Sequence, residues 1–331
     1  MKFPKFVLLT ALPALLLSTS LAAYAERAIS EQPDGVLGSL PESSMDQQQR
    51  CGTENIMIRR SRISPVLATG PLLPEEDSVT LQPIKLSPQR ISFLNWNLYK
   101  GNGVNWQSDF VRFAREHDVL AIQEARLDAA LHALLDDAGH NWSMNTAFYL
   151  KGHAAGVMTT SSATANDSCG FRVSEPVIRV PKSALVSYYA FEGHDERLLV
   201  ANIHSINFTL GMKSYRAQLQ QLYDAISHHD GPMIVAGDFN SWSDRRMRAV
   251  EQLVQRLDLA DIEYRQPHRT QVFGYEIDHV FYRQLEVVDN RVWPVTSSDH
   301  NPISVHFRYQ PLTSVPVSSV ATHSILTDQA R

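Results

Sequence analysis

This chain lacks a strong excess of charge of either sign. Its 331 residues include 30 Lys and Arg against 35 Asp and Glu, which gives a formal net charge of -5. A processive nucleic-acid binder usually presents a broad basic surface, so the charge balance argues against that class while leaving room for a small basic cleft. The composition, 44% hydrophobic and 20% charged, is typical of a globular protein, and the length suits one large domain with tails.

Long apolar runs are also scarce, and the one that stands out lies at the N-terminus. Lys2 and Lys5 precede or flank the apolar residues 6–17, and Ala23-Tyr24-Ala25 follow. This order is typical of an export signal that is cleaved after Ala25, and residues 6–17 are shorter than the roughly 20 residues of a membrane helix. We therefore expect a periplasmic or secreted protein. The alternatives are an uncleaved N-terminus that anchors the chain in the inner membrane, or a cytoplasmic protein.

Cysteine is rare, since Cys51 and Cys169 are the two cysteines of the sequence. In an exported protein these two residues could form a disulfide that ties the N-terminal segment to the domain. In a reducing compartment they would be inert thiols, and the sequence leaves both alternatives open. Two distant cysteines argue against a zinc site built on thiolates.

Composition divides the chain into five segments. Residues 1–25 form the expected signal peptide, and residues 26–50 are polar and rich in glutamine, as in a flexible linker. Residues 51–90 mix apolar residues with prolines that forbid long elements, which predicts an extended arm packing on the domain. Residues 91–308 form the domain itself, and residues 309–331 lack a pattern and are expected to be a disordered tail.

Strand and helix patterns alternate within residues 91–308. Apolar runs predict strands at 91–98, 119–122, 198–204, 277–282 and 303–307, besides a buried strand that begins at Met233. Apolar residues at helical spacing predict helices at 106–116 and 212–227, and a third that Ser243 caps and that ends near Leu257. Intermixed strands and helices indicate a layered α/β domain.

Polar residues that can do chemistry lie at the ends of these strands. The segment 233–242 shows the pattern best, because an apolar run leads through Gly237 to a carboxylate, Asp238, and an amide, Asn240. Ligands of open α/β sheets gather at strand ends, so a repeated placement of Asn, Glu, His and Asp there indicates a common site. Taken singly, each of these residues could be a turn residue or a surface charge. Taken together they are Asn97, Glu124, His204, Asp238, Asn240, Asp278, Asp299 and His300.

Six segments around these residues resemble, in order, the motifs of the endonuclease/exonuclease/phosphatase superfamily, which includes DNase I. More narrowly, Asn97-Leu98-Tyr99-Lys100 and Pro181-Lys182-Ser183-Ala184-Leu185-Val186 are similar to the bacterial YafD-like branch. The resemblance covers residues 91–308. The six segments are Asn95-Trp96-Asn97, Gln123-Glu124-Ala125, Asn202-Ile203-His204, Gly237-Asp238-Phe239-Asn240, Ile277-Asp278-His279 and Ser298-Asp299-His300-Asn301-Pro302.

The resemblance implies a fold and a reaction. The fold is an α/β (α+β) four-layer sandwich, with two mixed β-sheets packed face to face and helices outside. The reaction is metal-dependent hydrolysis of a phosphoester, with Glu124 as the main metal ligand and Asn97 and Asp299 near the metal. Asp238 and Asn240 correspond to the pair that orients water and holds the phosphate, and His300, fixed by Asp278, lies beside the scissile phosphate. His204 corresponds to a histidine that in DNase I has a glutamate partner, for which Glu175 is the candidate here.

The residue types support the same chemistry independently. Hard oxygen ligands suit Mg²⁺, with Mn²⁺ or Ca²⁺ as alternatives, and a histidine held by a carboxylate can act as acid or base on a phosphate. We expect a phosphodiesterase of the nuclease type first, with a lipid or inositol-phosphate phosphoesterase as the alternative. A binding protein that reuses the fold without catalysis is the alternative of another class. Cations near the motifs are candidates for gripping substrate: Lys100, Arg245 and Arg246, with Lys182, Arg126 and Arg248 as further neighbours.

Overall fold

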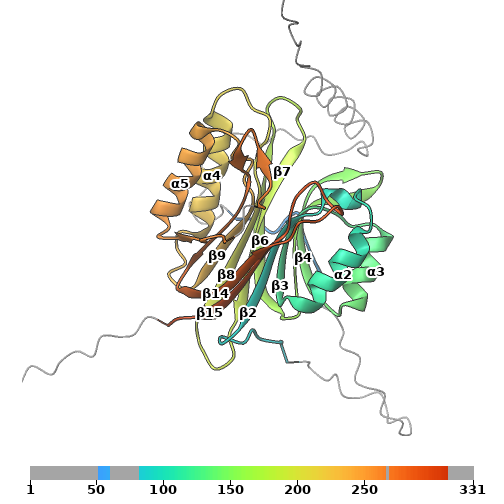
Figure 1. Cartoon of the computed structure of the whole chain (residues 1–331), viewed down its shortest axis with the longest axis vertical. Coiled ribbons are helices and arrows are strands. Elements are labelled where there is room, and N and C mark those ends of the chain that lie inside the picture. The colour runs from blue at the N-terminus through green and yellow to red at the C-terminus, as the bar shows by residue number, and fades with distance from the viewer. Residues whose placement is uncertain (1–50, 60–81, 266–267, 312–331) are drawn as a thin grey trace, which may run out of the picture.

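In the computed structural model, residues 51–59, 82–265 and 268–311 are described. Two mixed β-sheets pack face to face, and two pairs of helices cover their outer faces (Figure 1). This arrangement confirms the four-layer sandwich. The predicted signal peptide, the linker, most of the tail and part of the arm lie outside the described residues.

The first sheet has seven strands and carries two helices, α2 (Trp106–Glu116) and α3 (Ala129–Asp137), on its outer face. Its strands β2 and β3 are parallel, and the other neighbours are antiparallel. In spatial order they are β1 (Ile56–Arg59), β4 (Asn141–Leu150), β5 (His153–Ser161), β3 (Val119–Arg126), β2 (Ile91–Asn97), β15 (Ile303–Tyr309) and β14 (Leu285–Val292).

The second sheet has six strands, and α4 (Lys213–Ile226) and α5 (Asp244–Arg256) cover it. Here β8 and β9 are parallel. A separate small hairpin, β11 (Gln271–Val272) and β12 (Tyr275–Glu276), precedes β13. In spatial order the six strands are β10 (Ala260–Asp261), β13 (Asp278–Arg283), β9 (Met233–Asp238), β8 (Arg197–His204), β7 (Pro181–Ala190) and β6 (Ala165–Ser174).

Strand β9 shows how sequence alternation builds the layers. Ile234 and Ala236 point into the core between the two sheets, while Met233 and Val235 point into the core beneath α4 and α5. Successive side chains of a strand point to opposite faces, so a strand that is covered on both sides must be apolar throughout. Counting by two from Ile234 through Ala236, the same alternation puts Asp238, at the end of the strand, on the face that looks toward the other sheet.

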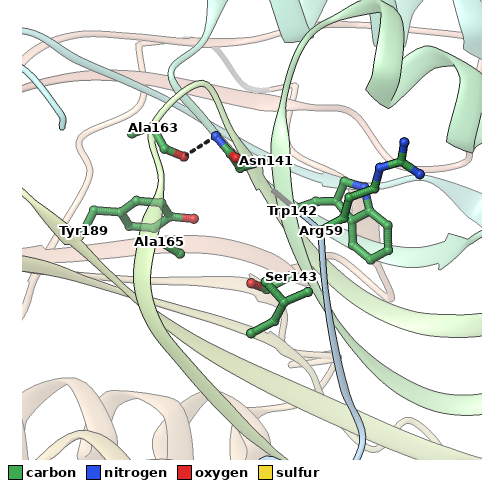
Figure 2. Close-up of a pocket in the computed structure, with 8 residues that line it drawn as sticks. Arg59, Asn141, Trp142, Ser143, Ala163, Ala165 and Tyr189 are labelled. Carbon is green, nitrogen blue, oxygen red and sulfur yellow. Dashed lines mark hydrogen bonds between the residues drawn. The ribbon is translucent and has the colours of Figure 1, made fainter. Parts of the chain in front are cut away.

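The N-terminal arm is attached to the domain covalently and by pairing. Cys51 forms a disulfide with Cys169 of β6, with 5.4 Å between their Cα atoms, so the pairing that the sequence left open is present. Strand β1 then adds an antiparallel edge to β4. A cavity of about 10 Å³ lies where Ile58 and Arg59 of β1 meet the domain. Figure 2 shows Arg59, Trp142, Ser143 and Tyr189 among its lining residues. This cavity contains none of the residues with predicted chemistry.

Within the described ranges, no helix has the length and apolar character that crossing a membrane requires.

Candidate functional site

Strand pairing brings the predicted polar residues to one end of the sandwich. In the second sheet, Asp238 at the end of β9 is the register partner of His204 on β8 and of Asp278 on β13. In the first sheet, Asn97 ends β2 and pairs with Gln123, the residue before Glu124. Asn97 also crosses between the sheets, because its Nδ2 donates a hydrogen bond to Asp238 Oδ2 at 3.1 Å.

The backbone is contorted at the same place. Gly237 has a φ of +150°, and a Cβ there would lie 1.9 Å from the carbonyl oxygen of Ile203, so the two strands approach too closely for any other residue. Glu124 and Asn240 have φ values of 51° and 46°, a left-handed conformation that is uncommon outside glycine. A register shift in β3 between Ile122 and Ala125 re-aims Glu124. Such strained residues cluster at functional sites.

His300 and Asp278 form a charged pair beside Asp238. His300 Nδ1 lies 2.7 Å from Asp278 Oδ2, and His300 Nε2 lies 4.0 Å from Asp238 Oδ2. Burial disfavours a charged imidazole, but the Asp278 carboxylate outweighs burial and raises the pKa of His300 to about 10. His300 is therefore an imidazolium at neutral pH, with Nε2–H directed toward the middle of the site.

His204 also lies beside Asp238, but the charged group nearest to its ring is the ammonium of Lys182. Its Nε2 is 2.7 Å from Lys182 Nζ, 3.3 Å from Asp238 Oδ2 and 4.0 Å from Glu124 Oε1. Burial and the Lys182 ammonium lower the pKa of His204 well below its ordinary value. His204 is therefore a neutral imidazole, and Lys182, which the sequence offered only as a neighbouring cation, belongs to the site.

Glu124 pairs with Lys100 in the same site. Burial would raise the pKa of Glu124, but the ammonium of Lys100, assisted by that of Lys182, lowers it well below its ordinary value. Glu124 is thus an ionised carboxylate whose surroundings can hold a cation. Asp299, in the loop before β15, is exposed and accepts a 3.4 Å hydrogen bond from Ser298 Oγ.

Asp238 and Asn240 are locked together by the turn that follows β9. The backbone N–H of Asn240 donates to Asp238 Oδ1 at 2.9 Å, and the side chain of Asn240 donates to the carbonyl of Ser205 at 3.0 Å. Burial raises the pKa of Asp238, against the opposing charge of His300. One carboxylate oxygen is fixed by the turn, and the other faces Asn97 and both histidines.

One group in this site has the spacing of a metal centre. Asp238, Asp278 and His300 each place a ligand atom within 4.8 Å of the others, and all three are buried. Asp278 Oδ1 has no hydrogen-bond partner among the described residues. This group differs from the predicted ligands Asn97, Glu124 and Asp299, whose oxygens also suit a hard cation.

One predicted substrate contact is wrong because the residue is buried. Arg246 was expected to grip substrate, but it is 1% exposed and its guanidinium donates to the carbonyls of Ile206, Asn207 and Asn240. It packs between the rings of Tyr215 and Trp242 and so braces the turns below the site. Its neighbour Arg245 is exposed, and it remains a predicted substrate contact.

Glu175 is not the partner of His204. Its carboxylate instead accepts the backbone N–H of Asn207 at 2.6 Å, in the loop after β8. The carboxylates that lie nearest to His204 among the described residues are Asp238 and Glu124.

Three further motif residues have a role that sequence reasoning did not give them. Gln123 Nε2 donates to Asn95 Oδ1 and to Asn202 Oδ1, both at 2.8 Å, and Asn202 Nδ2 returns a bond to the carbonyl of Met158 at 2.9 Å. These buried amides join the two sheets behind the site. Their positions inside the strand-end motifs were the available signal, and their burial and mutual hydrogen bonds indicate that they position the site rather than contact substrate.

A family model identifies the class of protein. Residues 94–300 match the model of the Endonuclease/Exonuclease/phosphatase family, so the chain belongs to that family.

Relatives extend over most of the domain. The chain is 38% identical over 218 residues to a UPF0294 protein of Vibrio parahaemolyticus, covering 66% of this chain and 77% of that protein. It is 39% identical over 222 residues to a UPF0294 protein of Klebsiella pneumoniae, covering 67% and 83%. The fold is similar to the crystal structure of an endonuclease/exonuclease/phosphatase from Beutenbergia cavernae, with a TM-score of 0.53, 19% identity and coverage of 67% and 72%.

Proposed function

We propose that this protein is a metal-dependent hydrolase that cleaves phosphodiester bonds by attack of water. The observation that carries the proposal is the arrangement around Asp238, where an imidazolium, His300, and a neutral imidazole, His204, lie within 4.0 Å of one carboxylate oxygen. Phosphoryl transfer needs an oriented nucleophile and neutralised oxygens, and this arrangement offers an acceptor and a cationic donor side by side.

The metal is proposed to bind on the Glu124 side of the site. Although Asp238, Asp278 and His300 have the spacing of a metal centre, Asp278 keeps His300 protonated, so a metal there would have to displace that proton before the imidazole could bind it. Glu124 is ionised, and Asn97 and Asp299 add oxygens, which fits Mg²⁺, with Mn²⁺ or Ca²⁺ as alternatives. A bound divalent cation would supply positive charge to the oxygens of the phosphate.

The residues of the chain then have separate tasks. Asp238 accepts a hydrogen bond from the attacking water and holds it in line, while the turn through Asn240 keeps the carboxylate in place. His300 donates Nε2–H to the phosphate or the leaving oxygen, and Asp278 keeps it protonated. Lys182 adds a second positive charge next to His204. The opposite charge states of the two histidines assign the roles of acid and base. The imidazolium of His300 can give a proton, and the neutral imidazole of His204 can accept one.

A soluble diester tests the reaction without assuming a natural substrate. We expect hydrolysis of bis(p-nitrophenyl) phosphate by the full chain with Mg²⁺, and loss of that activity with EDTA or with Glu124→Gln. Isothermal calorimetry of Mg²⁺ and Mn²⁺ gives a readout besides activity, because Glu124→Gln should weaken binding. A chain that binds metal but turns over no phosphoester would favour the non-catalytic alternative.

Nucleic acid and phospholipid or inositol phosphate are the two proposed substrate classes. The location stays proposed as periplasmic or secreted, or anchored by residues 1–25, as the order of charged and apolar residues there suggests.

A further inference from the structure

The strand directions place a defined set of loops around the site. Because β8 ends at the site and β7 runs antiparallel to it, the loop between β6 and β7 lies at the same end. The turn between β4 and β5 also lies there, because β5 is antiparallel to β3, which carries Glu124 near its end. The loop from β8 to α4 is the third. In Figure 1 these connections gather at the upper end of the sandwich.

Each of these three connections has, within it or at the end of the adjoining strand or helix, an exposed apolar side chain and, two or three residues later, an exposed cation. The exposed fractions are 47% for Tyr149, 54% for Val177 and 91% for Leu210. We call the six residues the loop rim. They are Tyr149 near the end of β4 and Lys151 in the turn that follows, Val177 and Arg179 in the β6–β7 loop, and Leu210 and Lys213 before and at the start of α4.

The strands that carry the loop rim are neighbours across the sandwich. Strands β4 and β5 of the first sheet face β7 of the second sheet, and β7 pairs with β8. Lys182, at the beginning of β7, contacts His204, so the β6–β7 loop adjoins that side of the site. None of the three rim cations forms an ion pair with another described residue, so their charge is available to a partner.

A lipid surface fits this combination. Apolar side chains at loop tips gain free energy when they enter the boundary between head groups and acyl chains, and neighbouring Lys and Arg are attracted by anionic head groups. Nucleic acid would use the cations and could stack a base on Tyr149, but two of the three apolar side chains, Val177 and Leu210, are aliphatic and offer no ring for stacking. In general, clustered apolar side chains on a protein surface mark a docking site.

We propose that the loop rim docks on an anionic phospholipid bilayer and presents a phospholipid phosphoester to the site. This inference rests on the proposed function for the reaction, while the docking itself stands on the loop rim. The sequence adds one consistent feature, because the apolar residues 6–17 would hold the chain at a membrane if the N-terminus stays uncleaved.

A fluorescent probe on the loop rim tests the docking locally. The two native cysteines form a disulfide, so Leu210→Cys introduces a single free thiol for an environment-sensitive label such as NBD. The matched control is Val288→Cys, which labels a half-exposed valine on the edge strand β14. With vesicles of phosphatidylcholine and phosphatidylglycerol we expect a blue shift and brightening at position 210 and an unchanged spectrum at 288. Any membrane binding through residues 1–25 is the same in the two labelled proteins, so it does not produce a difference between positions 210 and 288.

Charge reversal tests the cationic part. In the Leu210→Cys background, Lys151→Glu, Arg179→Glu and Lys213→Glu together should weaken the vesicle response about 100-fold or more, since each cation near an anionic surface contributes several-fold. Pure phosphatidylcholine should give a much weaker response. A probe at 210 that stays in a water-like environment, or an equal response at 288, would overturn the proposal. So would a response to a single-stranded oligonucleotide without one to vesicles, which would assign the loop rim to nucleic acid.

Activity separates failure of the docking from failure of the reaction. The triple charge reversal should hydrolyse bis(p-nitrophenyl) phosphate like the unaltered protein, but lose hydrolysis of vesicle phospholipid about tenfold or more. Insertion of the probe with no hydrolysis of any phosphoester would refute the proposed function and leave the docking intact. Hydrolysis of the soluble diester with no insertion would refute the docking alone.

Discussion

His300 and His204 both lie beside Asp238, but their surroundings have opposite charge. Asp278 holds His300 at 2.7 Å and raises its pKa to about 10, whereas Lys182 approaches His204 at 2.7 Å and, with burial, lowers its pKa. Equal burial therefore produces an imidazolium on one side and a neutral imidazole on the other, because the partner decides the sign. A site that needs both an acid and a base at one pH obtains them in this way.

Removing the carboxylate that sustains the imidazolium should have the largest effect. Asp278→Asn leaves His300 buried without its counter-ion, so its pKa falls and it loses its proton at neutral pH. We expect kcat for bis(p-nitrophenyl) phosphate to fall by about 10² to 10⁴, the range for loss of general acid catalysis. Loss should be greatest at alkaline pH. A variant that folds normally by circular dichroism and keeps its kcat would remove His300 from the mechanism.

The comparison extends to two cations, Lys182 inside the site and Arg246 beneath it. Arg246→Met removes three bonds to buried carbonyls, so the free energy of unfolding should fall by about 2–4 kcal/mol in urea titrations. The neighbouring exposed residue provides the control, and Arg245→Met should change stability by less than about 0.5 kcal/mol. Equal stability of the two variants would mean that Arg246 does not brace the turns.

Lys182→Met should bring the pKa of His204 closer to that of His300. Without the ammonium, the pKa of His204 rises toward its ordinary value of 6.5, so the neutral form is lost at a higher pH as the solution is acidified. We expect the acid limb of the kcat/KM profile to move to higher pH, with activity near pH 6 lower by up to about fourfold. Lys182→Arg keeps the charge and should keep the limb close to its original position. An unmoved limb in Lys182→Met would show that His204 is not the group that titrates.

His117 supplies a reference histidine away from the site, with a small expected effect. Burial lowers its pKa, and its ring nitrogens bond to the Phe113 carbonyl and to Ser304 Oγ. Below pH 6.5 the unfolded chain binds the proton that the folded chain refuses, so the free energy of unfolding decreases as pH falls through 6.5. His117→Gln should make this decrease shallower in thermal melts at several pH values. His228→Gln, at an exposed histidine, should leave the slope unchanged.

Strands and helices with strong local patterns were predictable from the sequence. The apolar run that opens β9 and the inner face of α4, which buries Tyr215, Leu219, Leu222 and Ile226, follow from the local sequence pattern alone. Strands β4 to β7 and helix α3 were not predicted as elements. Strands β4 and β6 carry polar residues such as Asn141, Asn145 and Ser168 that are buried by cross-strand bonds, which local periodicity does not reveal.

By itself, the sequence determined the list of chemical groups and their places at strand ends, because a motif such as Gly237-Asp238-Phe239-Asn240 is local. Tertiary structure alone decided which groups meet. Lys182 and Arg246 are both cations near motifs, yet one faces His204 and the other bonds only to carbonyls. Their fates depend on strand pairing and burial across residues far apart in the chain. The same contacts set the charge of each histidine, since desolvation and neighbouring charges act only after the sheets have packed.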